Sequence, residues 1–233
     1  MPSLTVENYV KTIFLICAVD RGQPAATGRL AGALGVSPGT VTSMLKTLSE
    51  SNLATYTPYE GVRLTPAGNA LALRVVRRHR LIELFLARTL DLSWDEVHEE
   101  AEHMEHAVSD RLIDRIDVHL GYPDADPHGD PIPRSDGSFD QSHGVALSQC
   151  ARGQEFRLAR VIDQSPEFLR YLSSVGLPLG AKGNVVLNQA EAGIVTVAVD
   201  RKETTLGRDA ADKILVTLVR GERVEGRGTR GES

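Results

Sequence analysis

The sequence predicts a mainly α protein with small β elements: a winged helix-turn-helix, a helical middle domain and a small β-barrel. Three patterns carry this prediction. Short amphipathic helices and two alternating strand-like runs come first, two long helical segments follow, and short strand-like runs fill the last third. We expect domains at 1–73, 74–142 (with a Pro/Gly-rich linker) and 143–220, and a disordered tail at 221–233.

Composition and charge exclude several classes of protein. The 233 residues are 41% hydrophobic and 24% charged, as in ordinary globular domains. No apolar run is long enough for a membrane span, and the first residues lack the order of a secretory signal. Two cysteines, Cys17 and Cys150, give no disulfide framework and fit a reducing compartment. We therefore expect a cytoplasmic protein that does not contact membranes.

The first domain begins with three predicted helices. Residues Val6–Val19 form an amphipathic pattern that Gly22 and Pro24 end. The next helix, Thr27–Leu34, has Thr27 as its expected N-cap, and Ser37-Pro38 opens the third. A short helix, a glycine-containing turn and a second helix with small polar groups facing outward are typical of a helix-turn-helix.

A two-stranded wing follows the third helix. The chain from Leu53 to Gly68 alternates as a strand, turns at Glu60-Gly61 and returns, and Thr65-Pro66 caps a further helix. Small outward groups can approach base edges and phosphates closely, and an arginine on the wing can meet the DNA backbone. The residues expected to contact DNA are Arg29, Ser37, Pro38, Gly39, Thr40, Thr42, Ser43, Lys46 and Arg63. The alternative is a winged helix that serves only protein contacts.

A net charge of −5 does not by itself indicate nucleic-acid binding, but the charge is uneven. The run from Arg74 to Arg80 is strongly basic, whereas the run from Trp94 to Glu105 is strongly acidic. An acidic protein still binds DNA when its basic residues gather on one face. The arginines at 74, 77, 78 and 80 either contact phosphates or lie exposed without a partner.

Histidine and glutamate side chains recur on the two helical segments predicted at Val75–Leu90 and Trp94–Leu120. Helical residues four apart share a face, so His79 and Glu83 lie one turn apart. In the second segment an arc of about 100° contains His98, Glu102, Glu105 and His106. Imidazole and carboxylate groups suit a borderline or hard divalent transition metal. The alternative is a polar network between subunits.

The composition then changes to Pro, Gly, Asp and Ser over residues 121–143, which indicates a domain boundary. Asp126 and His128 flank a proline there, and they either reach a metal or belong to a solvated turn. Beyond this boundary a short helix is predicted at Ser165–Leu172. Strand-like runs are Glu155–Val161, Lys182–Leu187, Gly193–Val199 and Ile214–Val219, which favour a small barrel.

Six motifs resemble those of a known family. They are Glu7–Ile13, Val36–Thr42, Leu64–Gly68, His79–Glu83, His98–His106 and Pro127–Pro133. With them the whole chain resembles the diphtheria-toxin-repressor family of metal-dependent transcriptional regulators, and most closely its manganese-responsive members with a third domain. That third domain resembles the SH3-like domain also found in ferrous-iron transport proteins.

The resemblance implies two neighbouring metal sites. Glu102, Glu105 and His106 match a site shared with the first helix, where Asn8 occupies a ligand position. His79, Glu83 and His98 match the second site, which loop and barrel residues complete; the candidates are Asp126, His128, Asp163, Gln164 and Glu167. Iron-responsive members place a cysteine where this chain has Glu102, and a carboxylate favours Mn²⁺, with Fe²⁺ second.

Two positions depart from the family pattern. Asn8 replaces the usual Asp or Met, and Lys11 stands where manganese-type relatives often carry an acidic residue. A cation beside the shared site opposes metal binding, so either the shared site is weak or the site of His79, Glu83 and His98 is dominant.

The resemblance further implies a homodimer that binds a pseudo-palindromic double-stranded DNA operator when metal-loaded and represses manganese or iron uptake genes. One alternative is a winged-helix regulator that senses another signal, with a purely structural His/Glu cluster. A carboxylate-bridged di-metal enzyme is the least favoured, because it requires two Glu-x-x-His motifs and only Glu100–His103 fits.

Overall fold

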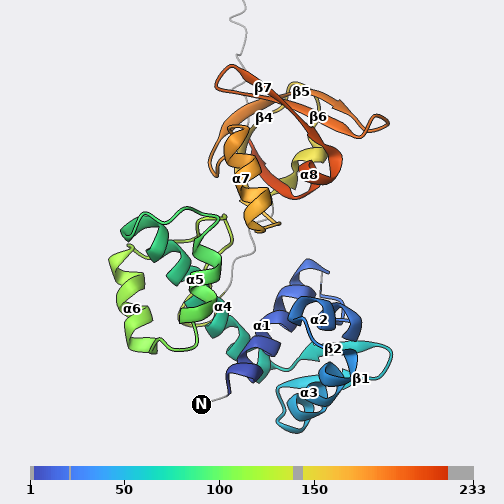
Figure 1. Ribbon diagram of the computed structural model, residues 1–233, viewed down its shortest axis with the longest axis vertical. Coiled ribbons are helices and arrows are strands. Elements are labelled where there is room, and N and C mark those ends of the chain that lie inside the picture. Colours follow the sequence, from blue (N-terminus) through green and yellow to red (C-terminus); the bar gives the residue numbers. More distant parts are fainter. Residues whose placement is uncertain (1–2, 21, 139–143, 220–233) are drawn as a thin grey trace, which may run out of the picture. The chain divides into compact units, whose positions relative to one another are not determined.

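The computed structural model describes residues 3–20, 22–138 and 144–219, and the chain forms two compact units that divide between Gln141 and Ser142 (Figure 1). Helices dominate the first unit, and a six-stranded antiparallel sheet forms most of the second. This confirms the predicted fold class. The boundaries of the three predicted domains stay a prediction. Among the described residues, no helix has both the length and the apolarity that crossing a membrane requires.

The first unit opens with three helices and a hairpin: α1 (Leu4–Val19), α2 (Thr27–Leu34), α3 (Pro38–Glu50), β1 (Ala54–Thr57) and β2 (Gly61–Leu64). Gly35 ends α2 with a φ of 64°, a conformation that favours glycine. The Ser37 side chain accepts a hydrogen bond from the Thr40 amide at 3.1 Å and caps α3, as predicted. The prediction for Thr27 was wrong by one position, because Ala26 is the N-cap and Thr27 is already helical.

The core of this region lies between α1, α2, α3 and the hairpin. Its fully buried side chains include Val10, Ile13, Leu30, Val41, Leu45, Leu48 and Val62. The hairpin is antiparallel, with Ala54 opposite Leu64. Thr65 caps the following helix, as predicted, by accepting from the Gly68 amide at 3.1 Å. Gly68 has no room for a side chain, because a Cβ there would lie 1.9 Å from the Leu53 carbonyl oxygen.

A long helix, α4 (Pro66–Thr89), leads from the hairpin into the rest of the first unit, where α5 (Val97–Met104) and α6 (Asp110–His119) pack against it. The single helix predicted at Trp94–Leu120 was wrong. The Ser109 side chain accepts from the Leu112 amide at 3.3 Å and starts a new helix. Glu105 and His106 therefore lie in the connection between two helices rather than on one helical face.

The Pro/Gly-rich stretch after α6 contains an ordered loop. An isolated β-bridge joins Ala125 to Pro131, and the Asp126 carboxylate accepts from the backbone amides of His128 at 2.8 Å and Asp130 at 2.9 Å. Asp126 is 3% exposed and His128 0%. The solvated-turn interpretation of this pair was therefore wrong. Residues 139–143 of the predicted linker lie outside the described residues.

The second unit contains β3 (Val145–Ala146), the 3-10 helix η1 (Leu147–Gln149), β4 (Glu155–Val161), α7 (Pro166–Ser174), β5 (Lys182–Gln189), β6 (Ile194–Val199), β7 (Lys202–Gly207), α8 (Arg208–Asp212) and β8 (Ile214–Leu218). The strand order is β3-β8-β4-β5-β6-β7, and the sheet curves round a core that includes Phe156, Leu158, Val197 and Val216 (Figure 1). The sequence did not predict β3, β7 or α8. The predicted tail, 221–233, lies outside the described residues.

Candidate metal centre

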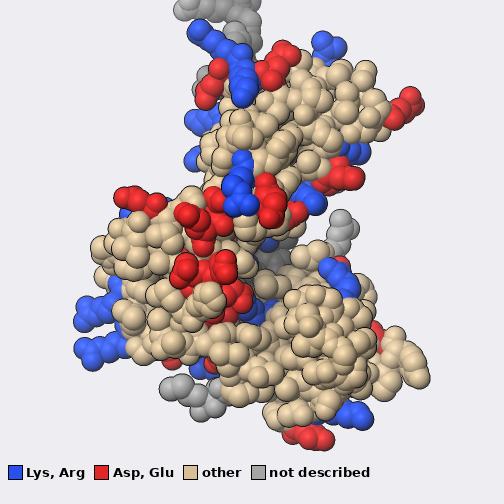
Figure 2. Space-filling view, viewed as in Figure 1, with Lys and Arg blue, Asp and Glu red and all other residues tan. Residues whose placement is uncertain are grey.

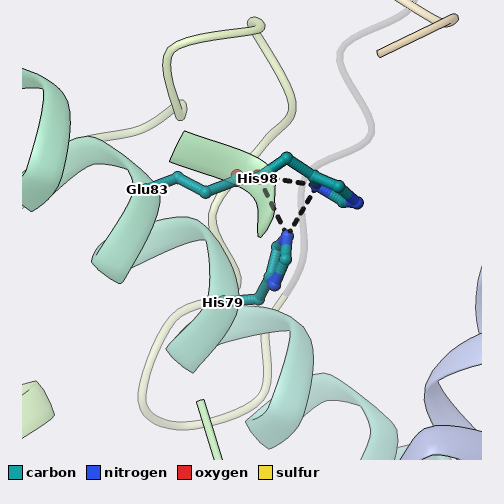
Figure 3. A group of neighbouring side chains, drawn as sticks. All are labelled: His79, Glu83 and His98. Carbon is teal, nitrogen blue, oxygen red and sulfur yellow. Dashed lines mark hydrogen bonds and ion pairs between the residues drawn. The ribbon is translucent and has the colours of Figure 1, made fainter. Parts of the chain in front are cut away.

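Three of the predicted ligands meet where α5 faces the middle of α4. His79 and Glu83 lie one turn apart on α4, and His98 reaches them from α5 (Figure 3). The Glu83 Oε1 atom accepts from His79 Nε2 at 2.9 Å and from His98 Nδ1 at 3.0 Å. Possible ligand atoms of all three residues lie within 4.8 Å of one another. We call these residues, together with Asp126 and His128, the α4–loop group.

The ordered loop completes the α4–loop group from the other side. The Nδ1 atom of His128 lies 3.9 Å from Glu83 Oε2 and 3.9 Å from Asp126 Oδ1. His128 uses its other nitrogen, Nε2, to donate to the Trp94 carbonyl at 2.6 Å, which orients the ring and leaves the Nδ1 lone pair free. Glu83 Oε2 and His128 Nδ1 are both buried and have no hydrogen-bond partner. Such bare buried donor atoms fit a divalent cation.

Three buried carboxylates, Glu83, Asp126 and Asp130, lie in and around the α4–loop group, with His79 and Arg80 as their cationic partners. Burial raises the pKa of Asp126, and the nearby charges of Glu83 and Asp130 raise it further, against the opposing effect of Arg80. Burial would lower the pKa of His79, but the charge of Glu83 and hydrogen bonds to Glu105 and Glu83 outweigh it and raise the pKa to about 9. Buried carboxylates in excess of their cationic partners are expensive unless a further cation joins them.

The other predicted ligands, Glu102, Glu105 and His106, meet the first turns of α1. We call them, with Asn8 and Lys11, the α1–α5 group. The Nε2 atom of His106 lies 2.6 Å from Asn8 Oδ1 and 3.1 Å from Glu105 Oε1. Asn8 therefore lies beside the cluster, where the family motif had placed it.

Lys11 lies at the centre of the α1–α5 group. Its ammonium donates to Glu102 Oε1 at 2.7 Å and to Glu105 Oε2 and Oε1 at 2.8 and 3.0 Å. Burial would raise the pKa of Glu102, but the charge and hydrogen bond of Lys11 lower it. The carboxylates of this group thus already have the Lys11 ammonium as their partner.

His79 belongs to both groups. Its Nε2 faces Glu83, while its Nδ1–H donates to Glu105 Oε2 at 2.6 Å, and the Lys11 ammonium lies 3.1 Å from the same Nδ1. Possible ligand atoms of His79, Glu102 and Glu105 also lie within 4.8 Å of one another. The family motif had placed His79 only with Glu83 and His98, so this shared position comes from the structure alone.

Glu7 is a residue of this centre that the sequence analysis missed. Its Oε2 atom lies 2.7 Å from Nδ1 of His106 and orients the imidazole so that Nε2 faces Asn8 and Glu105. Glu7 is 8% exposed, and Arg78 approaches its other carboxylate oxygen at 3.7 Å. Its place next to Asn8 in the chain was the only signal that could have indicated this role.

The three candidates from the second unit lie around the start of α7. Asp163 accepts from the Ser165 amide at 3.0 Å and from Lys213 Nζ at 2.8 Å. Glu167, in the first turn of α7, lies 3.7 Å from an Arg170 nitrogen. Gln164 is half-buried between them in the chain. A role for Asp163, Gln164 and Glu167 as metal ligands stays a prediction.

The candidate DNA-binding residues lie on and around α3. Ser37, Pro38, Gly39, Thr40, Ser43 and Lys46 are exposed, and Thr42 is half-buried. The exposed Arg29 pairs with Asp20, and the exposed Arg63 on the wing donates to the Gly22 carbonyl oxygen. Contact of these residues with DNA stays a prediction.

Two arginines of α4 are buried and paired. Arg77 is 7% exposed and pairs with Asp117 at 3.0 Å, and Arg80 is 5% exposed and donates to the Pro131 carbonyl at 2.5 Å. The expectation that these two lie exposed or contact phosphates was therefore wrong.

Figure 2 shows acidic side chains gathered over α5, where Glu99, Glu100 and Glu102 are exposed.

Three family models match successive parts of the chain. Residues 1–62 match the iron-dependent repressor N-terminal DNA-binding domain, residues 65–134 match the iron-dependent repressor metal-binding and dimerisation domain, and residues 145–218 match the FeoA domain.

Individual proteins are similar over long stretches. The diphtheria toxin repressor of Corynebacterium efficiens is 29% identical over 93% of this chain and 96% of its own length. The iron-dependent repressor IdeR of Mycobacterium leprae is 32% identical over 70% of this chain and 68% of its own. A solved manganese-dependent transcriptional repressor in complex with manganese has a TM-score of 0.82 and 39% identity, covering 92% of this chain and 100% of that one.

Proposed function

The chain belongs to the iron-dependent repressor family, which includes the diphtheria toxin repressor, and we propose that it is a metal-dependent, DNA-binding transcriptional repressor. The resemblance found in the sequence motifs is thereby confirmed. The observation that carries the proposal is the α4–loop group, where buried Glu83 and His128 present donor atoms without hydrogen-bond partners. Those atoms lie in the part of the chain that matches a metal-binding domain.

Manganese is the proposed signal, with Fe²⁺ as a second activator. His79, Glu83, His98, Asp126 and His128 would hold the ion, and its positive charge would neutralise their buried carboxylates. All these donors are nitrogen or oxygen, and nitrogen and oxygen donors without thiolate suit Mn²⁺ and Fe²⁺. Relatives include manganese-dependent and iron-dependent repressors, which supports both ions.

The helices connect the metal centre to the DNA-binding region. α4 begins beside the wing and carries His79 and Glu83 further along, while α1 packs in the helix-turn-helix core and presents Asn8 to His106, which follows α5 in the chain. A metal that gathers side chains from these elements would bind one arrangement of them better than another. That difference shifts the population toward the DNA-competent arrangement, with a coupling of about 1–3 kcal/mol.

We propose a homodimer in the cytoplasm that reads a pseudo-palindromic operator with its two α3 helices about 34 Å apart. Its targets would be manganese or iron uptake genes. The relatives are repressors, and we propose a regulator rather than an enzyme.

The test is DNA binding as a function of metal. The full chain is titrated with Mn²⁺, Fe²⁺ and Zn²⁺ under anaerobic conditions against its own upstream DNA and metal-transporter promoters. We expect Mn²⁺ to raise the affinity for the specific DNA roughly 5- to 150-fold, and chelator to abolish this increase. Lys46→Ala should weaken DNA binding and its salt dependence without changing Mn²⁺ binding. Binding of the true operator that is equal with and without metal would refute metal control.

A further inference from the structure

The Lys11 ammonium occupies the position that a metal would take in the α1–α5 group. Three N–H bonds are available to a lysine, and here they meet three carboxylate oxygens: Glu102 Oε1 at 2.7 Å and both oxygens of Glu105 at 2.8 and 3.0 Å. Because these oxygens are the ones a cation would bind, the ammonium and a metal cannot both be held there.

The surroundings of Lys11 allow it to leave. Glu105 is fully buried and the Lys11 side chain is 8% exposed, but the Glu102 side chain is 44% exposed, so the group is open to solvent on the Glu102 side. Lysine has a flexible four-carbon stem, and its head can move to water while the stem stays packed.

A complete donor set remains once the ammonium is withdrawn. Asn8 lies three residues before Lys11, on the same face of α1, and its Oδ1 is already 2.6 Å from His106 Nε2. The same Nε2 lies 3.1 Å from Glu105 Oε1. Glu102 and Glu105, released from Lys11, would add carboxylate oxygens to this amide and imidazole, a set that suits Mn²⁺.

We propose that Lys11 is a tethered competitor for the metal: its ammonium fills the α1–α5 group in the metal-free protein, must be displaced before a metal binds there, and so sets the metal concentration at which the group fills. This inference rests on the proposed metal-dependent function and identifies a residue that determines its threshold. Because the displaced side chain belongs to α1, filling of this group also breaks the ion pairs that join α1 to α5.

The main experiment counts Mn²⁺ ions bound by the Lys11→Met variant, using the electron paramagnetic resonance signal of free Mn²⁺ in equilibrium titrations. The change is made in wild type and in the Glu83→Gln background, where binding to the α4–loop group is impaired. Methionine keeps the length of the stem and removes the charge. The control is Lys46→Met, which removes one positive charge from the same unit on the exposed surface of α3.

We expect Lys11→Met to tighten Mn²⁺ binding by the α1–α5 group about 10- to 100-fold, because a hydrogen bond to a charged group changes an equilibrium constant by one to two powers of ten. Lys46→Met should leave it unchanged. Equal or weaker binding in folded Lys11→Met would overturn the inference while leaving wild-type metal binding, and so the proposed function, intact. Absence of Mn²⁺ binding in every variant would overturn both.

A second measurement uses the wild-type chain, so it does not depend on the variant folding. An amine-selective acylating reagent is applied with and without Mn²⁺, and the modification of each lysine is followed by mass spectrometry. Displacement predicts that Lys11 reacts several-fold faster relative to Lys46 when Mn²⁺ saturates the protein. A Lys11 reactivity that stays constant while Mn²⁺ binds would overturn the inference.

Discussion

Replacement of Glu83 by glutamine tests the centre of the α4–loop group with almost no change in shape. Glu83 is 1% exposed; its Oε1 atom accepts from His79 and His98, and its Oε2 atom has no hydrogen-bond partner. An amide keeps one acceptor for the two histidines but loses the charge and one metal-binding oxygen. The variant therefore separates the cost of the hydrogen bonds from the value of the metal ligand.

The magnitudes follow from these contacts. Without metal, Glu83→Gln weakens the hydrogen bonds from His79 and His98, which should reduce the free energy of unfolding by about 1–2 kcal/mol. With Mn²⁺ at about 100 times the wild-type Kd, binding should stabilise wild type by about 2.7 kcal/mol. Loss of a residue that only orients a metal ligand weakens binding by up to about 100-fold; if loss of the Glu83 ligand weakens it at least as much, the same Mn²⁺ concentration stabilises the variant by no more than about 0.4 kcal/mol.

The assay is thermal unfolding with and without Mn²⁺. At roughly 2–4 °C per kcal/mol, the ion should raise the wild-type Tm by about 5–10 °C and that of Glu83→Gln by about 1–2 °C. Glu60→Gln, which changes an exposed carboxylate on the wing turn, is the matched control and should behave as wild type. If Mn²⁺ stabilises Glu83→Gln as much as wild type, Glu83 is not a metal ligand and the assignment of the group is wrong.

Three further variants test the fold. Gly68→Ala should destabilise the protein by about 3 kcal/mol, because its Cβ would lie 1.9 Å from the Leu53 carbonyl oxygen. Gly32 is a helical position where a Cβ would have no atom within 4 Å, so Gly32→Ala should instead stabilise the protein slightly. Urea unfolding of both variants measures this contrast. The hydrogen bond from Arg78 lowers the pKa of Asp110 in the folded protein below 3.8, its value in the unfolded chain. The ionised carboxylate therefore stabilises the fold above pH 3.8, and this stabilisation is lost as the pH falls through the folded-state pKa. Asp110→Asn should therefore cost about 0.5 kcal/mol at neutral pH, and equal stability differences at acid and neutral pH in chemical denaturation would contradict this.

The candidate site shows where local spacing stops being informative. A separation of four residues placed His79 and Glu83 on one face of α4, and that part of the site followed from helix geometry alone. The break at Ser109 moved Glu105 and His106 off the helix, so the single arc predicted for them was wrong, although both still reach α1. The contacts that a side chain makes with other helices and loops depend on how these elements pack, and the periodicity of one helix does not predict this packing.

The sequence by itself determined the order of elements, the caps at Ser37 and Thr65, and most of the residue types that gather at the metal centre. Such features depend on contacts within a few residues, where backbone geometry leaves few choices. Only the tertiary structure decided that His79 serves both groups, that His128 is buried with a bare Nδ1, and that the Lys11 ammonium lies among the carboxylates. Those outcomes join residues up to 94 positions apart, as in the contact of Lys11 with Glu105, and they are set by how the helices pack.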